Sequence, residues 1–106
     1  MVTHAKLMKL SRRIAQQFAP ERIVLFGSRA RGRARSDSDV DLLVVMRHRG
    51  ASARKAAEIL NAVEPEFPVD LIVRTPKELR RRLAQNDSFF GEITRRGRVL
   101  YDAARG

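Results

Sequence analysis

The feature that most constrains this sequence lies between residues 23 and 46, where two β-prone apolar runs enclose a polar segment. The first run, residues 23–26, ends at Gly27-Ser28, and the second, residues 40–46, begins beside Asp39 and Asp41. A glycine directly after a strand permits a turn and lets another group approach the backbone closely. We therefore expect a strand, a turn into a short helix with Ser28 as its N-cap, and then a second strand buried on both faces.

Gly27 and Ser28 are the candidates for binding phosphate. The first amides of a helix point away from its end and carry a partial positive charge. Because Gly27 has no Cβ, an anion can come close to this backbone. The turn is therefore predicted to seat a phosphate group.

The two aspartates at the start of the second run are the candidates for binding metal. Asp39 and Asp41 are two residues apart, so strand alternation directs both carboxylates to the same side. Two carboxylates beside a phosphate seat indicate a divalent cation. Asp37 has the same parity but precedes the apolar run, and we interpret it as a solvated turn residue.

Asp70 is the third candidate carboxylate. It is the single charge in residues 68–73, another β-prone run, where an unpaired carboxylate would be costly to bury. If this strand pairs beside the strand that follows Asp39, Asp70 can join the same cluster. Carboxylates of this kind hold Mg²⁺, and two such ions about 3.5 to 4 Å apart can clamp the attacking and leaving oxygens of a phosphoryl transfer.

The remaining chain reads as helices around these strands. Apolar residues at helical spacing predict an amphipathic helix that ends before Pro20, and a second helix is expected over residues 51–63. The inward residues are expected to be Leu7, Leu10, Ile14 and Phe18 in the first helix and Ala53, Ala56, Ala57 and Leu60 in the second.

Signals for helix ends divide the C-terminal part of the chain. Thr75, Pro76 and Glu78 form a capping box in which Glu78 reaches back to the cap. Residues 86–88 break the helix and restart it, with Phe89, Phe90 and Ile93 packing inward. Gly97 is expected to end the second part as a C′ glycine, before a short strand at residues 99–101.

Composition is typical of one small globular domain over residues 1–106. Hydrophobic residues make up 43% of the chain and charged residues 32%, which is unlike a disordered segment. The absence of cysteine excludes a disulfide framework and a thiolate metal site. Without a long apolar segment we expect no signal peptide and no membrane span, and therefore a cytoplasmic protein.

The net charge of +10 indicates attraction to polyanions or to an acidic partner. Nucleic acid is one such partner. Against a dedicated single-strand binder, the sequence contains no helix-turn-helix or zinc-knuckle pattern, and aromatic residues are only 6%. A general arginine bias of the composition explains the charge equally well.

Three motifs together resemble those of the nucleotidyltransferase superfamily: G-S-R-A-R-G at 27–32, S-D-V-D-L-L-V at 38–44 and V-D-L-I-V at 69–73. The short chain is similar to the minimal members, the MNT type. The resemblance implies an α/β (α+β) palm like that of polymerase β, a mixed sheet flanked by helices. It also implies that Asp39 and Asp41 hold the metals, that Asp70 helps to activate the acceptor hydroxyl, and that Gly27-Ser28 holds the nucleoside triphosphate. Arg31 either contacts phosphate or braces the loop, and larger members carry a helical region that this chain lacks.

The same resemblance gives the expected function. It implies that the chain uses Mg²⁺, with Mn²⁺ as a substitute, to transfer a nucleoside monophosphate to an acceptor hydroxyl, with ATP as the expected donor. Minimal members are commonly paired with a small helical HEPN toxin, which suggests an antitoxin that modifies its partner. Two alternatives remain open: an antitoxin that only masks its partner by binding, and a basic nucleic-acid-binding module.

Overall fold

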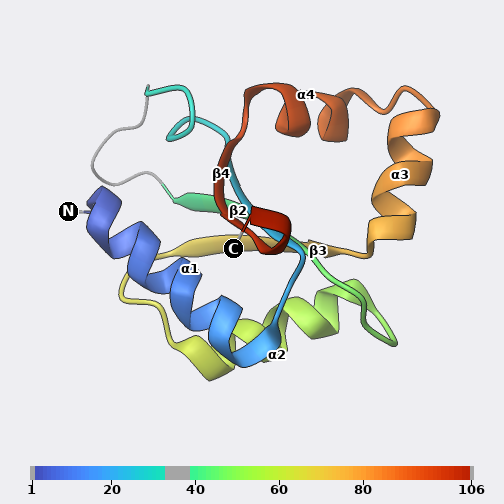
Figure 1. The fold of residues 1–106 in the computed structure, drawn as a ribbon. Helices are drawn as coiled ribbons and strands as arrows, with labels where there is room; N and C mark the ends of the chain where they lie inside the picture. Colours follow the sequence, from blue (N-terminus) through green and yellow to red (C-terminus); the bar gives the residue numbers. More distant parts are fainter. Residues whose placement is uncertain (1, 33–38, 106) are drawn as a thin grey trace.

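The computed structural model describes residues 2–32 and 39–105. Along them lie α1 (His4–Phe18), β1 (Arg22–Phe26), β2 (Val40–Val45), α2 (Ser52–Val63), β3 (Val69–Arg74), α3 (Pro76–Ala84), α4 (Ser88–Arg96), β4 (Arg98–Asp102) and a 3₁₀ turn, η1 (Ala103–Arg105). The strands form a mixed sheet in the order β3-β2-β1-β4 (Figure 1). β1 is antiparallel to β2 and β4, whereas β2 and β3 are parallel. The predicted mixed sheet flanked by helices is confirmed.

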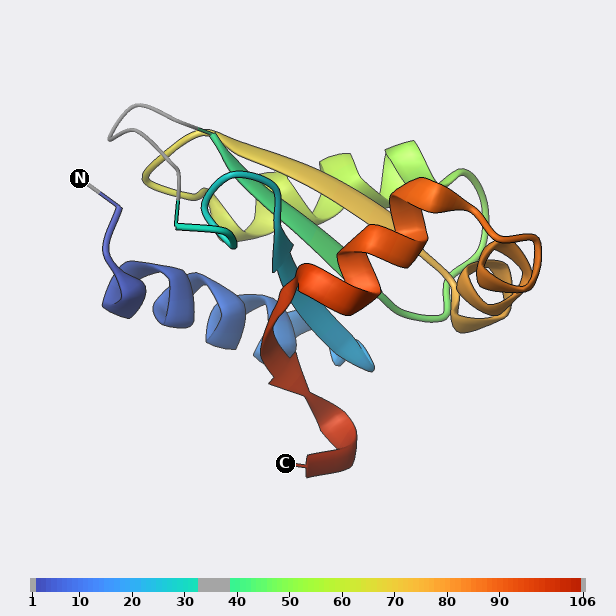
Figure 2. The same cartoon turned by 90° about the horizontal axis from the view of Figure 1, so that it is seen from above.

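The helices cover the sheet in two layers. α1 and α2 lie on one face, and α3 and α4 lie on the other (Figures 1 and 2). Each face has its own hydrophobic cluster, because successive side chains of a strand point to opposite sides. Among the described helices, none is both long enough and apolar enough to cross a membrane.

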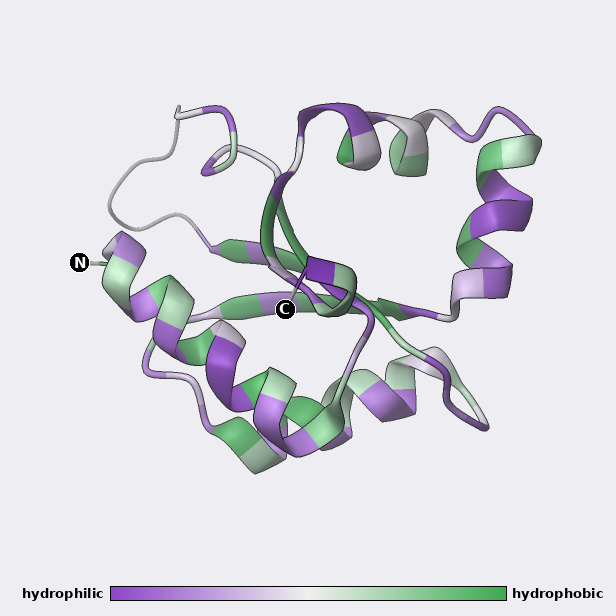
Figure 3. Ribbon diagram, in the orientation of Figure 1, coloured by the Kyte–Doolittle hydropathy of each residue, from purple (hydrophilic) through white to green (hydrophobic). Residues whose placement is uncertain are grey.

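β2 is the central buried strand. Val40, Leu42 and Val44 pack toward α1 and α2, and Leu43 and Val45 pack toward α3 and α4. This burial confirms the prediction of a strand covered on both faces. Figure 3 shows the corresponding hydrophobic colours along the inner strands, with hydrophilic colours on the outer surfaces of the helices.

The two N-terminal helices form where the sequence predicts them, but the buried side of α2 differs. In α1, Leu7, Leu10 and Ile14 are buried, and Ala19 ends the helix in a left-handed conformation. In α2, the predicted burial of Ala53 and Ala57 is wrong, since both are exposed. The buried stripe is instead Ala56, Ile59 and Val63, because the larger Ile and Val side chains take the face that meets the sheet.

The prediction of a short helix after Gly27-Ser28 is wrong for the described residues. Residues 27–32 form turns, closed by a hydrogen bond from the Gly32 amide to the Arg29 carbonyl at 3.3 Å. Gly27 and Gly32 both have positive φ, at 76° and 71°, which interrupts the right-handed helical path after one turn. Ser28 is exposed and is not an N-cap, and Asp37 lies outside the described residues.

Local hydrogen bonds set the start of α3 and α4. The Thr75 hydroxyl accepts from the Glu78 amide at 3.1 Å, as predicted. The reciprocal half of the capping box is not formed, because the Glu78 carboxylate pairs with Arg81 and Arg82. Asp87 caps α4 by accepting from the Phe90 amide at 3.0 Å, which explains the restart of the helix.

The end of α4 differs from the expected C′ glycine. Gly97 has an extended conformation with φ of −70°, so it does not form a left-handed cap. Its lack of a side chain is still required, because a Cβ there would overlap the Ile93 carbonyl and the Val24 side chain. Phe90 and Ile93 are buried as predicted, whereas the predicted burial of Phe89 is wrong, since it stays 47% exposed.

Candidate functional site

Asp41 and Asp70 lie side by side on neighbouring strands. The parallel pairing of β2 with β3 makes them direct register partners. Both side chains are on the face covered by α3 and α4, because Asp41 alternates with Leu43 and Asp70 with Ile72, which pack there. The condition for a third carboxylate, that its strand pairs beside the D-x-D strand, is therefore met.

Asp39 lies at the same end of the sheet. It is exposed and immediately precedes β2, which begins at Val40. Partial burial raises the pKa of the Asp41 carboxyl, and the negative charges of Asp70 and Asp39 raise it further. The structure thus brings the charges of all three predicted carboxylates into one neighbourhood.

Gly27 places the turn after β1 directly against Asp41. A Cβ on Gly27 would overlap the Asp41 Oδ2 atom, and the φ of 76° is one that only glycine adopts readily. Phe26, the residue before it, is the register partner of Asp41 on β1. The group that approaches Gly27 in this structure is therefore a carboxylate of the same chain, and the phosphate contact at this turn stays a prediction.

The carboxylates fit a hard divalent cation by their chemistry, but they do not converge on one point. Within residues 2–32 and 39–105, no group of three or more Asp, Glu, His or Cys side chains is arranged to hold a metal ion. Asp39 and Asp70 are exposed, so their carboxylates can turn away from Asp41 and reduce the repulsion among like charges. Carboxylate oxygens are the ligands that a cation such as Mg²⁺ prefers, so Asp41, Asp39 and Asp70 could hold one only with their side chains turned toward a common point.

Arg31 connects the turn to α4. Its guanidinium lies 3.0 Å from the Glu92 carboxylate, and both side chains are about half exposed, at 41% and 44%. The sequence left two roles open for Arg31, contact with phosphate or bracing of the loop. In this structure the ion pair with Glu92 corresponds to bracing of the loop. The Glu92 contact could not be read from the sequence, because nothing local relates residues so far apart in the chain.

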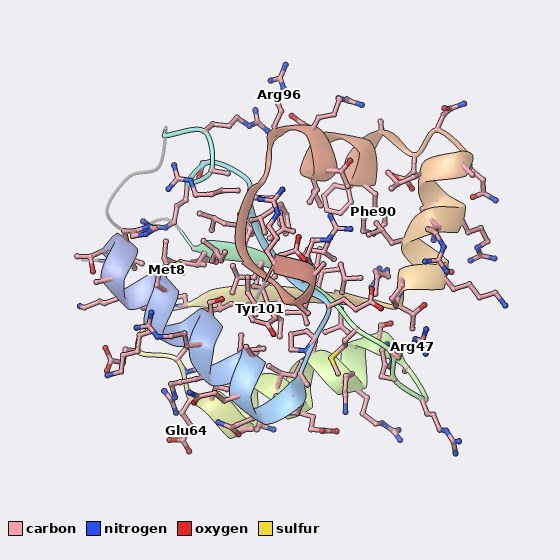
Figure 4. All side chains as sticks on the ribbon, viewed as in Figure 1. Met8, Arg47, Glu64, Phe90, Arg96 and Tyr101 are labelled. Atoms are coloured by element: carbon pink, nitrogen blue, oxygen red, sulfur yellow. The ribbon has the colours of Figure 1, made fainter. Side chains whose placement is uncertain are left out.

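A small cavity lies between the turn and α4. It has a volume of about 160 Å³ and is lined by Phe26, Gly27, Ala30, Arg31, Phe89, Glu92, Ile93, Arg96 and Gly97. Phe89 stands at its border, edge-to-face with Phe26 at a centroid distance of 5.8 Å. Figure 4 shows Phe90 directed inward from α4 and Arg96 directed outward at its end. Sequence reasoning did not connect Phe89 or Glu92 with the site.

Comparison with known proteins identifies the family of this chain. The nucleotidyltransferase domain family matches residues 7–95, which include all six predicted site residues. The chain belongs to the nucleotidyltransferase domain family. A comparison of this nucleotidyltransferase with curated proteins finds no match.

Solved structures share the fold of this nucleotidyltransferase. A candidate nucleotidyltransferase from Sulfolobus solfataricus matches with a TM-score of 0.65 and 22% identity over 96% of this chain and 82% of the other. A toxin-antitoxin complex with AMP-PNP matches at 0.56 and 23% identity, covering 98% and 77%. A mutant of the toxin-antitoxin pair MntA-HpeT, with two aspartates replaced by glutamate, matches at 0.53 and 20% identity, covering 98% and 76%.

Proposed function

We propose that this nucleotidyltransferase transfers a nucleoside monophosphate, with ATP as the expected donor, to a hydroxyl of a partner protein. The observation that carries the proposal is the pairing of Asp41 with Asp70 across β2 and β3, next to Gly27 and with Asp39 at the same end of the sheet. Membership of the family supports transferase chemistry. The specificity for AMP and for a protein acceptor is our inference.

Each site residue has a proposed role in this reaction. Gly27 and Ser28 accommodate the triphosphate on the turn, and Arg31 turns from Glu92 to a phosphate oxygen. Asp39, Asp41 and Asp70 would hold the metal. Bound Mg²⁺, as two ions, or Mn²⁺ in its place, would neutralise the charge that develops on the phosphate oxygens.

The bond changes follow a direct displacement at the α-phosphorus. The Asp70 carboxylate accepts the proton of the acceptor hydroxyl, whose oxygen then forms a bond to the α-phosphorus. The bond from that phosphorus to the bridging oxygen breaks, and pyrophosphate leaves with the electron pair. The product is a phosphodiester between AMP and the acceptor oxygen.

The partner is proposed from the structural neighbours and from the resemblance to minimal nucleotidyltransferases. Two of the similar folds belong to toxin-antitoxin complexes, one of them with the ATP analogue AMP-PNP. In the MntA-HpeT variant the two replaced aspartates are two positions apart, as Asp39 and Asp41 are here. We therefore propose that this chain is the antitoxin of a small helical HEPN-type toxin.

ATP labelled at different phosphorus atoms tests which group the chain transfers. The purified chain is incubated with Mg²⁺ and the protein encoded by the neighbouring reading frame, using ATP labelled at the α- or the γ-phosphorus. Label on the partner from α-labelled ATP alone supports the proposal, whereas label from the γ-position would indicate a kinase. If the wild-type chain transfers label from neither, the proposed transferase function is wrong.

The two alternatives make different predictions for Asp39→Asn. An antitoxin that only masks its partner would still neutralise the toxin with this substitution. A nucleic-acid-binding module, which the net charge of +10 favours, would bind RNA or DNA with an affinity that falls steeply with salt and does not depend on the carboxylates.

A further inference from the structure

β3 has one free edge. It is the end strand of the sheet, with β2 on its other side. The Val40 amide donates to the Pro68 carbonyl at 3.1 Å, and the Met46 amide donates to the Arg74 carbonyl at 3.0 Å. The backbone N–H and C=O groups of successive residues point to opposite sides of a strand. The even-numbered residues of β3 therefore bond to β2, and the N–H and C=O groups of Val69, Leu71 and Val73 point outward, away from β2.

Among the described residues, the outward backbone groups of β3 without a hydrogen-bond partner lie beside Asp70. At the C-terminal end of the strand, the Arg74 guanidinium donates to the Val73 carbonyl at 2.7 Å and so occupies this part of the edge. In the part of the chain that the structure describes, no backbone hydrogen bond reaches the outward groups of Val69 or Leu71. These two residues flank Asp70, whose side chain is exposed.

A strand added at this edge would extend a row of functional side chains. Phe26, Asp41 and Asp70 are successive register partners across β1, β2 and β3, and Gly27, the residue after Phe26, lies against Asp41 in the middle of this row. The next position in the row lies on the added strand, opposite Asp70. In an antiparallel addition this would be a pair without direct hydrogen bonds, with Cα atoms about 4.5 Å apart, the closest arrangement of two side chains in a sheet.

The groove that continues from Leu71 toward Arg74 favours acidic residues on one side of the hydroxyl residue, whereas the open part of the edge itself lies beside the exposed carboxylates of Asp39 and Asp70. A groove of about 620 Å³ runs beside the C-terminal half of β3 between α2 and α3, and its lining includes Leu71, Arg74 and Arg82. Among the described residues that line it, the one carboxylate is Glu78, which is engaged by Arg81 and Arg82, and Arg82 also lies 3.5 Å from the Asp87 carboxylate. The net charge of +10 opposes a second copy of this chain at the same edge.

We propose that an extended acidic segment of the acceptor protein adds to the free edge of β3 at Val69 and Leu71, and places its hydroxyl residue opposite Asp70. This inference rests on the proposed function and identifies how the acceptor is bound. The hydroxyl proton passes to the adjacent Asp70 carboxylate as the oxygen attacks the α-phosphorus, and pyrophosphate leaves as described above.

Two synthetic polymers test the charge and the extended form of the acceptor. A random copolymer of glutamate and tyrosine is acidic, unfolded and rich in hydroxyls, and a copolymer of lysine and tyrosine is its matched control. With α-labelled ATP and Mg²⁺, we expect the glutamate copolymer to be labelled at least about tenfold faster than the lysine copolymer. Equal labelling of the two would overturn the acidic specificity.

Substitutions at Leu71 test the edge itself. Leu71→Pro removes the outward N–H and places a ring in the path of an added strand, but it leaves the bonds to β2 intact. Leu71→Ala removes the same side chain and keeps the N–H. We expect labelling of the glutamate copolymer by Leu71→Pro to fall about tenfold or more below that of Leu71→Ala, with equal thermal stabilisation of both variants by Mg²⁺ and ATP. Equal labelling by the two variants overturns the proposal.

Amide hydrogen exchange on the wild-type chain avoids any folding defect of the variants. The glutamate copolymer should slow exchange at the Val69 and Leu71 amides, whereas the ladder amides of Asp70 and Ile72 are slow throughout. If these two amides stay unprotected while label is transferred, the acceptor binds elsewhere. A wild-type dimer that Leu71→Pro dissociates would assign the edge to a second copy and overturn the proposal.

Two results distinguish a failure of the edge proposal from a failure of the proposed function. If the wild-type chain labels the neighbouring protein but neither copolymer, the proposed function stands and the edge proposal fails. If it labels no acceptor at all, the proposed function itself fails.

Discussion

At the scale of single residues, Gly27 combines a left-handed backbone conformation with a close contact to a residue of the candidate site. Two features of Gly27 each favour glycine at this position: its φ of 76° and its close contact with Asp41. A second glycine of this chain has the first feature without the second. Gly50 has nearly the same φ, 79°, but nothing within 4 Å of an added Cβ. The two glycines therefore form a matched pair for substitution.

We expect Gly27→Ala to be more damaging than Gly50→Ala. Gly50→Ala should cost roughly 1 to 2 kcal/mol through its left-handed backbone alone. Gly27→Ala should cost at least about 1 kcal/mol more, because the methyl group displaces Asp41, and it should also abolish transfer. Urea unfolding and the α-label assay measure the two effects, and equal losses of stability would contradict the close contact with Asp41.

The Asp41 carboxylate is proposed to be needed for transfer, but its negative charge lowers the stability of the metal-free fold. Its raised pKa indicates that the ionised carboxylate is disfavoured in the metal-free fold. We expect Asp41→Asn to lower the transfer rate by at least about 100-fold and to leave the melting temperature in EDTA equal to that of the wild type or higher.

Two comparisons check this expectation. Glu21→Gln removes an exposed carboxylate at the opposite end of β1 from Phe26, the partner of Asp41, and should leave transfer unchanged. Mg²⁺ with ATP should raise the melting temperature of the wild type but not that of Asp41→Asn. A clear loss of stability of Asp41→Asn in EDTA would show that Asp41 is a structural residue.

At the scale of the elements, α4 and the turn after β1 act together through one ion pair. Arg31 and Glu92 are both about half exposed, so their contact contributes little to folding. A triphosphate offers Arg31 a stronger partner than a single carboxylate. The ion pair is therefore suited to hold the guanidinium near the turn until a nucleotide arrives.

Glu92→Gln tests this exchange of partners. We expect the free energy of unfolding to change by less than about 1 kcal/mol and the affinity for ATP to rise by roughly two- to fivefold, because Arg31 no longer has to leave an anion. Calorimetric titration with Arg31→Ala as the control measures the effect. If Glu92→Gln weakens ATP binding as much as Arg31→Ala does, the ion pair positions the turn instead of competing with the nucleotide.

At the scale of the whole molecule, the carboxylates couple stability to pH and to metal. Because the pKa of Asp41 is higher in the folded than in the unfolded chain, the folded protein binds this proton first on acidification. The contribution of Asp41 to stability therefore rises as the pH falls through its folded pKa, and it is constant below the unfolded pKa.

We expect two opposite trends with falling pH. In EDTA, the melting temperature of the wild type should move upward relative to that of Asp41→Asn. In Mg²⁺ and ATP, the stabilisation of the wild type should shrink over the same range, because protons compete with the cation for the carboxylate. Parallel melting curves of the two proteins at every pH would exclude Asp41 as the coupled group.

Local patterns were sufficient for most of the elements. The strands, α1, the Thr75 cap and the Asp87 restart follow from side-chain periodicity and from hydrogen bonds over three or four residues. The same local reasoning failed where another local preference competes. It predicted a short helix after Gly27-Ser28, where two glycines with positive φ produce turns, and a capping box at Glu78, whose carboxylate prefers two arginines one turn away.

The residues that could form the site are recognisable in the sequence: a glycine turn, a D-x-D pair and one carboxylate in a third strand. The tertiary structure pairs β3 in parallel beside β2, so that Asp70 stands next to Asp41, and it brings Glu92 to Arg31. It also decided that Arg74 closes one end of the β3 edge and leaves the other open. The reason is physical: a strand or a cap depends on neighbours within a few residues, whereas strand order and edge exposure depend on how the helices bury the two faces of the whole sheet.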